Sequence, residues 1–267
     1  MRCLLLTLLL TFGLSAPVLA AERIVSLAPS LTEIVIELGA KAQLVGVLDG
    51  GPRPDAVADL PSVGRYAQLE VETLLALQPD LILMWPGSIS QAQRQQLQAF
   101  GIPMLIAEPH TLATLADQFA EIGQRIGRAK QGRQLQQLFH KGLTDLRSRY
   151  HRERPLSVFY QVWDKPLYTL GGQQIISDAL RVCGAENIFA NLKLPAPQVS
   201  VEAVLQLNPD VILAGSSAQL EAWQRWPNIK AVARKQLWLV PDKGLERPSF
   251  QMLNATAQLC QVLARAQ

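Results

Sequence analysis

Hydrophobic and polar residues follow the same order in two separate stretches of the chain. Residues 71–83 read VETLLALQPDLIL, and residues 201–213 read VEAVLQLNPDVIL. Eight of the thirteen positions are identical, and the second copy begins 130 residues after the first. Because solenoid repeats recur about every 20–50 residues, a spacing this long predicts two related lobes instead.

Each copy predicts a short helix followed by a buried strand. Val71, Leu74 and Leu75 are spaced by three and four residues, as on one apolar face of a helix. The Pro-Asp pair in each copy ends the helix, because proline disfavours the helical conformation in the residue before it. The continuous apolar runs 81–84 and 211–214 are typical of parallel strands that are covered on both faces.

Strands and helices alternate through most of the remaining chain. Further strands are predicted at 23–27, 44–47, 104–106, 157–161 and 236–240, and helices at 31–38, 90–100, 174–182 and 251–266. This alternation predicts an α/β fold with parallel sheets.

Residues 129–150 differ from the stretches around them. They are rich in Gln, Arg, Lys and Leu and contain no proline, which predicts one long, mostly exposed helix. We therefore expect an N-terminal α/β lobe at 21–127, a linking helix at 128–152 and a C-terminal α/β lobe at 153–267.

The first twenty residues have the pattern of a cleavable secretory signal peptide. Arg2 is their only charged residue, Leu4–Leu14 form an apolar core, and small residues precede a cleavage site expected after Ala20. The apolar core is shorter than the roughly 20 residues that a membrane-spanning helix needs. We expect an exported protein, with a retained membrane anchor as the alternative.

The charge and cysteine content further limit the classes of protein that fit this sequence. Removal of Arg2 leaves 24 Lys and Arg against 22 Asp and Glu. This mild balance does not indicate binding to nucleic acid, which usually requires a basic patch. The mature chain would keep Cys183 and Cys260, and two cysteines in an exported chain favour a disulfide over two buried free thiols.

The loops after the strands are the expected place for a ligand. In open α/β sheets, ligands bind beyond the carboxyl ends of the strands. The candidate residues at these ends are Gly50, Tyr66 and Trp85 in the first lobe, and Trp163, Asp242, Lys243, Gly244, Leu245, Glu246 and Arg247 in the second. If the lobes face each other, these loops line one cleft, and the three aromatic residues supply flat apolar contact. Packing in the core is the alternative for each of them.

Glu72 and Glu202 hold equivalent positions in the first turn of the repeated helix. A carboxylate there offsets the helix dipole by about 0.3–1 kcal/mol, which is one explanation. The other is a matched pair of surface charges, with one glutamate on each lobe.

Catalytic and metal-binding motifs are absent from the sequence. HExxH, GxSxG and a Gly-rich phosphate loop do not occur. His110, His140 and His151 are scattered and are predicted to lie on the surface, so no zinc site is expected. We predict neither an enzyme nor a resident metal. A secreted α/β hydrolase or chelatase is the alternative, for which only His110 lies near a strand end.

Several segments together resemble one known family. They are RIVSLAPSLTE at 23–33, GRY at 64–66 with the first repeat, VCGAENIF at 182–189, PQVS with the second repeat at 197–213, ERPS at 246–249, and Cys260. Over essentially all of residues 22–267, the chain resembles the periplasmic substrate-binding proteins of ABC importers for cobalamin, iron-siderophore complexes and haem. The VCGAENIF and PQVS segments are most similar to the members that bind cobalamin (vitamin B12).

The resemblance implies two Rossmann-like lobes with parallel sheets, joined by one long rigid helix, with the ligand cleft between the lobes. It implies a periplasmic monomer that carries cobalamin or a related corrinoid as its ligand and has no cofactor. Cys183 and Cys260 would form the family's disulfide. Glu72 and Glu202 would dock onto arginines of the permease dimer of the ABC importer. Tyr66, Trp85 and the loop Asp242–Glu246 would contact the corrin ring and its nucleotide.

The sequence departs from the cobalamin-binding pattern on the cleft walls. Aromatic residues are expected where this chain has Gly50 and Ala196, and Trp163 stands where a smaller residue is expected. A ring contact that has moved from one wall to another would explain this exchange.

Siderophores and haem are the alternative ligands. Haem needs a Tyr or His axial ligand, for which Tyr66 is the candidate. An anionic siderophore needs several cationic groups, and Arg65 and Arg247 are the candidates.

Overall fold

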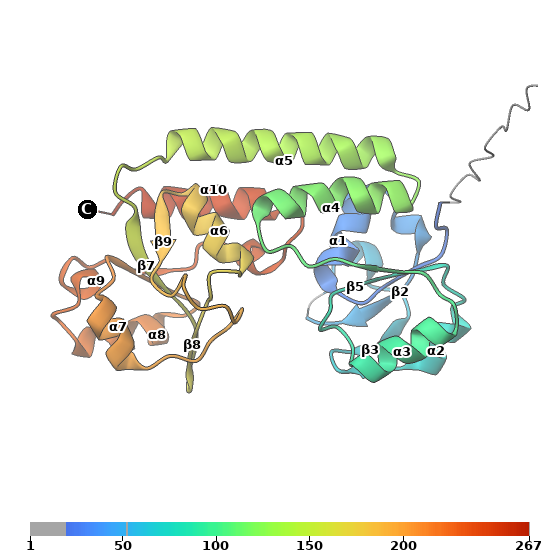
Figure 1. The fold of residues 1–267 in the computed structure, drawn as a ribbon, viewed down its shortest axis with the longest axis horizontal. Helices are drawn as coiled ribbons and strands as arrows, with labels where there is room; N and C mark the ends of the chain where they lie inside the picture. Colours follow the sequence, from blue (N-terminus) through green and yellow to red (C-terminus); the bar gives the residue numbers. More distant parts are fainter. Residues whose placement is uncertain (1–19, 52, 267) are drawn as a thin grey trace, which may run out of the picture.

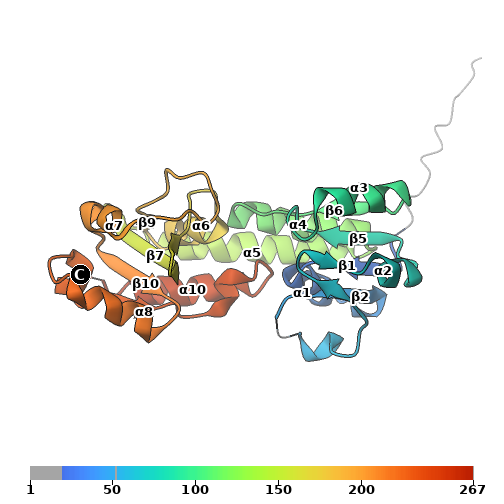
Figure 2. The same ribbon diagram turned by 90° about the horizontal axis from the view of Figure 1, so that it is seen from below.

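The computed structural model describes residues 20–51 and 53–266, which form two α/β lobes lying side by side (Figure 1). The predicted leader, except Ala20, falls outside these residues. Three long helices lie along one side of the lobes (Figures 1 and 2): α4 (Leu112–Arg125), α5 (Ala129–Arg149) and α10 (Met252–Leu263). Within the two described ranges, no helix is both long and apolar enough to cross a membrane.

The N-terminal lobe is built on a six-stranded sheet with the order β4-β3-β2-β1-β5-β6. The strands pair in parallel except for β4, which is antiparallel to β3. In chain order the elements are β1 (Ile24–Ser26), α1 (Pro29–Glu37), η1 (Lys41–Gln43), β2 (Leu44–Asp49), η2 (Asp55–Val57), β3 (Ser62–Arg65), β4 (Gln68–Leu69), α2 (Val71–Ala76), β5 (Leu81–Met84), α3 (Gln91–Ala99) and β6 (Met104–Ile106).

The C-terminal lobe has a five-stranded sheet in which β11, β10 and β7 are parallel neighbours. The free edge of the long strand β7 pairs with β9 in parallel near its start and with β8 in antiparallel near its end. The elements are β7 (Leu156–Asp164), β8 (Leu167–Thr169), α6 (Ile175–Val182), β9 (Ala185–Asn187), α7 (Val201–Leu207), β10 (Val211–Ala214), α8 (Ser217–Glu221), η3 (Ala222–Arg225), α9 (Lys230–Ala233), β11 (Leu237–Leu239) and η4 (Lys243–Glu246). The predicted α/β class with two lobes is confirmed.

The two repeated segments fold into the same unit, as their shared pattern predicted. α2 leads into β5 and α7 leads into β10, and both strands are fully buried. The aspartate of each Pro-Asp pair reaches the neighbouring strand segment. Asp80 Oδ1 accepts a hydrogen bond from the backbone N–H of Arg23 at 3.0 Å, and Asp210 Oδ2 accepts one from Ser157 at 3.0 Å. Each copy of the repeat therefore supplies an aspartate that hydrogen-bonds the backbone at the start of the neighbouring strand.

Successive residues of the central strands face different cores. Leu81 and Leu83 of β5, and Val211 and Leu213 of β10, point into one continuous apolar core that also contains residues of α1, α4, α5, α6 and α10. The opposite face of each sheet has a separate core, which contains Ile82 in one lobe and Ile212 in the other. The helices therefore join the lobes through a shared hydrophobic core.

The helices α4 and α5 form a closely packed antiparallel pair. A Cβ atom at Gly132 would overlap the carbonyl oxygen of Phe119, so glycine allows this contact. The rings of Phe119 and Phe139 meet edge to face with centroids 5.4 Å apart, and Phe250, just before α10, contacts both. The long helix predicted at 129–150 is α5, and it is anchored by the buried side chains of Phe139, Leu143 and Leu146.

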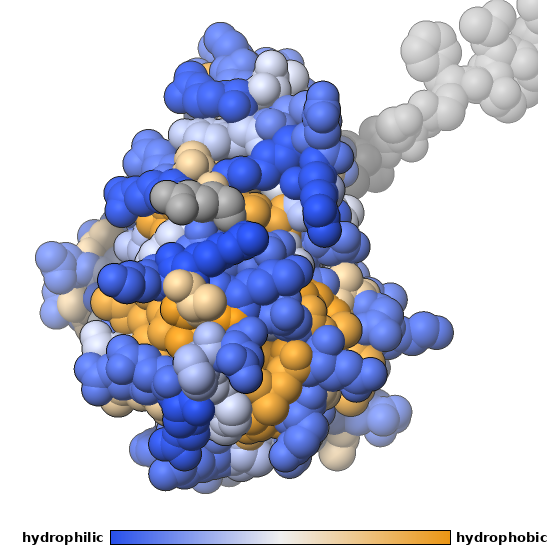
Figure 3. Space-filling view, turned by 90° about the vertical axis from the view of Figure 1, so that its left-hand side faces the viewer, coloured by the Kyte–Doolittle hydropathy of each residue, from blue (hydrophilic) through white to orange (hydrophobic). Residues whose placement is uncertain are grey.

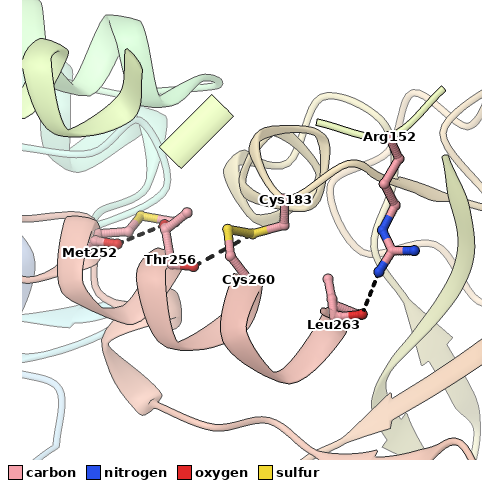
Figure 4. The surroundings of a disulfide bond; sticks show 6 residues. All are labelled: Arg152, Cys183, Met252, Thr256, Cys260 and Leu263. Carbon is pink, nitrogen blue, oxygen red and sulfur yellow. Dashed lines mark hydrogen bonds between the residues drawn. A yellow bond between two sulfur atoms is a disulfide. The ribbon is translucent and has the colours of Figure 1, made fainter. Parts of the chain in front are cut away.

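A disulfide joins Cys183, at the end of α6, to Cys260 in α10 (Figure 4). This bond confirms the predicted pairing, and both cysteines are buried. Close to it, the Arg152 guanidinium donates a hydrogen bond of 2.9 Å to the carbonyl oxygen of Leu263, in the last turn of α10. The closing helix is therefore tied to the C-terminal lobe at two points.

Two carboxylates of α1 reach across to the segment before α10. Glu33 Oε1 lies 2.6 Å from Arg247 Nη2, and Glu33 Oε2 accepts hydrogen bonds from the Ser249 hydroxyl at 3.0 Å and from the Gln251 side chain. Glu37 accepts hydrogen bonds from the backbone N–H of Phe250 at 2.9 and 3.1 Å. Polar contacts therefore reinforce the shared apolar core between the lobes.

Candidate functional site

A cavity of about 310 Å³ opens between the two lobes. Its lining comes from strand-end loops of both sheets: Tyr66, Trp85, Pro86, Gly87, Glu108, Pro109 and His110 on one side, and Gln173, Gln174, Ile175, Pro195, Leu245, Glu246 and Pro248 on the other. This position agrees with the general rule that α/β proteins bind ligands beyond the carboxyl ends of their strands.

Two aromatic residues form the wall on the N-terminal lobe. Tyr66 lies at the tip of the β3–β4 hairpin and is 68% exposed. Trp85 directly follows β5, and the turn after it is held by a hydrogen bond of 3.1 Å from the Trp85 backbone N–H to the buried Ser88 hydroxyl. The Tyr66 hydroxyl lies beside Gly87 of this turn. The wall therefore offers flat apolar surface on a fixed backbone.

The opposite wall depends on two glycines that precede α6. A Cβ atom at Gly171 would overlap the carbonyl oxygen of Leu194, and the Gly171 N–H donates a hydrogen bond of 3.1 Å to the carbonyl oxygen of Pro195. A Cβ atom at Gly172 would likewise overlap the backbone at Ala190. The glycines let these segments approach closely, which brings Pro195 and the residues after Gly172 to the cavity.

The third part of the lining is the loop before α10. The Asp242 side chain accepts hydrogen bonds from the Gly244 N–H at 2.7 Å and from the Gln258 side chain of α10 at 2.8 Å. This fixes the short helix η4, which ends at the cavity with Leu245 buried and Glu246 exposed.

His110 joins the two sides of the cavity. It follows β6, and its Nδ1 atom lies 3.1 Å from the backbone carbonyl oxygen of Gln173 in the other lobe. Its Nε2 atom lies 3.8 Å from Glu108 Oε2. The charged side chains among the lining residues are therefore the carboxylates of Glu108 and Glu246 and, when protonated, this imidazole; the lining residues that the structure describes include no lysine or arginine.

The structure brings four of the predicted ligand residues into this lining: Tyr66, Trp85, Leu245 and Glu246. Gly50 instead lies against the Pro29 ring, next to a small separate hollow. Trp163 is 57% exposed near the end of β7, outside the lining. Asp242, Lys243 and Gly244 shape η4 without lining the cavity, and Arg247 pairs with Glu33.

Sequence reasoning did not assign to the site the lining residues that follow β6, those that follow the glycine pair, or Pro195; the full set is Glu108, Pro109, His110, Gln173, Gln174, Ile175 and Pro195. The rule about strand ends could have found the first three, since β6 was predicted to end at residue 106. The others follow no predicted strand, since β8 was not predicted, and their position depends on the close backbone contact at Gly171.

Glu72 and Glu202 lie away from this cavity. Both are exposed, and they lie in α2 and α7, at opposite ends of the molecule on the side facing away from α5 (Figure 1). Hydrogen bonds from its own backbone N–H and from the Ser200 hydroxyl lower the pKa of Glu202 below its usual value.

A larger cavity of about 480 Å³ belongs to the C-terminal lobe alone. It is lined by Pro155, Ser157, residues 186–192 and Leu207. The end face of this lobe is mostly hydrophilic, with a central band of exposed hydrophobic residues (Figure 3). Since this cavity receives no strand end from the N-terminal lobe, we regard the cavity between the lobes as the candidate site.

In the described part of the chain, no three His, Cys, Asp or Glu side chains cluster in a way that could hold a metal ion.

Comparison with known proteins identifies the family to which the chain belongs. The sequence model described as "Periplasmic binding protein" matches residues 24–243. The chain belongs to the periplasmic binding protein family.

Three relatives illustrate the similarity. The vitamin B12-binding protein of Vibrio campbellii (strain ATCC BAA-1116) is 33% identical over 90% of this chain and 89% of its own length. That of Yersinia pestis (strain Pestoides F) is 35% identical over 94% of this chain and 89% of its own. The crystal structure of the periplasmic vitamin B12 binding protein BtuF of Vibrio cholerae matches with a TM-score of 0.83 at 33% identity, covering 91% of this chain and 97% of that one.

Proposed function

We propose that this protein captures cobalamin or a related corrinoid in the periplasm and delivers it to an ABC importer. The observation that carries the proposal is the similarity, at 33–35% identity over at least 90% of the chain, to proteins named for vitamin B12 binding. In this proposal the corrinoid is cargo and not a resident cofactor, the protein performs no chemistry, and it acts as a monomer exported by its leader peptide.

The composition of the cavity supports a corrinoid over the alternative ligands. Tyr66 and Trp85 offer apolar surface to a macrocycle, while Gln173 and Gln174 can exchange hydrogen bonds with the amide groups at its edge. Haem carries two carboxylates and many ferric siderophores are anionic. The Glu108 and Glu246 carboxylates would repel such ligands. Of the two cations expected to attract them, Arg247 is paired with Glu33 and Arg65 lies outside the lining.

The test of the ligand is calorimetric titration of the mature protein with cyanocobalamin, using haemin and a ferric siderophore as controls. We expect tight one-to-one binding of cyanocobalamin and no comparable binding of the other two. Binding of haemin or the siderophore in place of cyanocobalamin would overturn the assignment of the ligand.

A matched pair of tryptophan variants tests the location of the site. Trp85→Ala should weaken cyanocobalamin binding at least about tenfold, equivalent to about 1.4 kcal/mol, because Trp85 lines the cavity. Trp163→Ala serves as the control, since Trp163 lies outside the lining, and its affinity should match the wild type. Equal losses in the two variants would mean that Trp163 moves to the ligand on binding.

We further propose that Glu72 and Glu202 dock the protein onto the permease of the importer. Three observations support this docking role: both glutamates are exposed, they hold equivalent positions in the two repeats, and they lie far apart on one side of the molecule. Carboxylates pair strongly and specifically with arginine, which suits a two-point dock.

If Glu72 and Glu202 dock the protein, replacing them should abolish delivery of the ligand to the permease without changing the affinity for the ligand. The Glu72→Ala, Glu202→Ala double variant should bind cyanocobalamin like the wild type but fail to support uptake by the permease in proteoliposomes. The exposed Glu121 of α4 lies near the opposite side, so Glu121→Ala should transport normally. A double variant that still transports, or one that loses ligand affinity, would contradict the docking role.

A further inference from the structure

The hydrogen bond between His110 and Gln173 determines which imidazole nitrogen carries the proton. A backbone carbonyl oxygen can only accept a hydrogen bond, so at 3.1 Å the Nδ1 atom of His110 must be the donor. In a neutral imidazole the other nitrogen, Nε2, then has a free lone pair. The Glu108 Oε2 atom lies 3.8 Å from Nε2, which is beyond hydrogen-bonding distance.

The carbonyl group that orients His110 is itself held firmly. The Gly172 N–H donates a hydrogen bond of 2.9 Å to the carbonyl oxygen of Leu192, immediately before Gln173. After Gln173, the Gln174 side chain caps α6 by accepting a hydrogen bond of 2.5 Å from the Ile176 N–H. The imidazole therefore hydrogen-bonds across the cavity to a backbone segment fixed at both ends.

This arrangement matches the way proteins prepare a histidine to bind a metal. Histidines that bind metals donate their second ring N–H to a carboxylate or backbone carbonyl, which fixes the tautomer and the orientation of the ring. His110 makes that contact, lines the cavity and has a side chain that is 52% exposed. The other partner of a metal bond must come from the ligand, because the described residues form no metal-binding cluster of their own.

We propose that His110 Nε2 binds the metal of the captured corrinoid at an axial position by replacing a weakly held ligand such as water. This inference rests on the proposed function. The cobalt–water bond breaks, the Nε2 lone pair forms a cobalt–nitrogen bond, and water leaves for solvent. The oxidation state of cobalt does not change, and no proton is transferred. A strongly held ligand such as cyanide stays in place, so the protein distinguishes corrinoids by the lability of their axial ligand.

The test is the visible absorption spectrum of aquacobalamin bound to excess protein at neutral pH, compared with the complex of aquacobalamin and free imidazole. Wild-type protein should shift the bands to the positions of the imidazole complex, and cyanocobalamin should show no such shift. His110→Ala should abolish the shift, and its loss of affinity for aquacobalamin should exceed any loss for cyanocobalamin by about tenfold or more. His140→Ala, on the outer helix α5, should behave as the wild type.

The measurement on the wild type decides the question even if the His110→Ala variant folds poorly. Tight binding of aquacobalamin without the imidazole-like shift would overturn the role of His110 and leave the proposed function intact. A shift that persists in a folded His110→Ala or His110→Gln variant would likewise assign the bond to another residue. Failure of both corrinoids to bind in calorimetry would overturn the proposed function together with this inference.

Discussion

Replacement of Glu37 by glutamine should change how the stability of the protein depends on pH. Glu37 is half-buried at the contact between α1 and the segment before α10. Burial raises the pKa of its carboxyl from 4.5 to about 7, the nearby charge of Glu33 adds to the rise, and hydrogen bonds from the Phe250 N–H and from Ser249 oppose it. Glutamine keeps an oxygen that accepts the Phe250 hydrogen bond but removes the charge.

The sign and size of the effect follow from proton linkage. Below pH 4.5 the carboxyl is protonated in both the folded and the unfolded chain. Between pH 4.5 and about 7 the unfolded chain releases the proton while the folded chain keeps it, so the free energy of unfolding falls as pH rises. Each pKa unit corresponds to about 1.4 kcal/mol. Because Glu37 is partly exposed, we expect the free energy of unfolding to fall by about 1–3 kcal/mol in total over this pH range.

The assay is urea unfolding of the wild type and the Glu37→Gln variant, followed by tryptophan fluorescence at pH 4.5, 6 and 8. The stabilities should be similar at pH 4.5, and at pH 8 the variant should be more stable by about 1–3 kcal/mol. Parallel pH profiles for the two proteins would refute the reasoning.

Glu33 lies one helical turn earlier in α1, and its replacement should change the stability in the opposite direction. Glu33→Gln breaks the 2.6 Å ion pair with Arg247 and should therefore destabilise the protein at pH 8, by about 1–3 kcal/mol. If both substitutions stabilise, the gain would come from lower charge at this contact in general and not from the protonation of Glu37.

Three further variants test the helix packing and the disulfide. Removing the disulfide with Cys183→Ser and Cys260→Ser should lower the free energy of unfolding by roughly 4 kcal/mol, because the bond closes a loop across 77 positions. Thermal unfolding measures this loss, and adding a reductant should lower the stability of the wild type but not of the variant. Gly132→Ala should destabilise by about 1–3 kcal/mol despite alanine's higher helix propensity, because the new Cβ meets the backbone of Phe119. Gly142→Ala in the same helix meets only a flexible side chain and should be nearly neutral in urea unfolding; equal effects at both glycines would contradict this steric reasoning.

The parts of the fold that depend on local pattern could be predicted from the sequence. The spacing of Val71, Leu74 and Leu75 indicated α2, and the continuous apolar runs indicated β5 and β10. These signals are local, since the period of a helix and the burial of a strand are encoded within a few residues. The repeated segment also revealed the two lobes, because both copies carry the same contacts.

The candidate site was only partly predictable. Tyr66 and Trp85 follow strands that end at the cavity, so the strand-end rule found them. Trp163 follows the strand predicted at 157–161, but β7 continues to Asp164 beyond its pairing with β10 and pairs only with β8 there, which carries the residue away from the cavity. No local pattern distinguishes a strand that ends at the cleft from one that continues beyond it.

The sequence by itself determined the α/β class, the two repeated lobes, the long helix α5 and the pairing of Cys183 with Cys260. Only the tertiary structure decided how the lobes face each other and therefore which loops share the cavity. That arrangement depends on contacts between distant residues, such as Glu33 with Ser249, which lie 216 positions apart. It also depends on a core to which both sheets and five helices contribute. Local hydrophobic periodicity shows that a residue is buried, but the partner it is buried against is chosen by the packing of the whole chain.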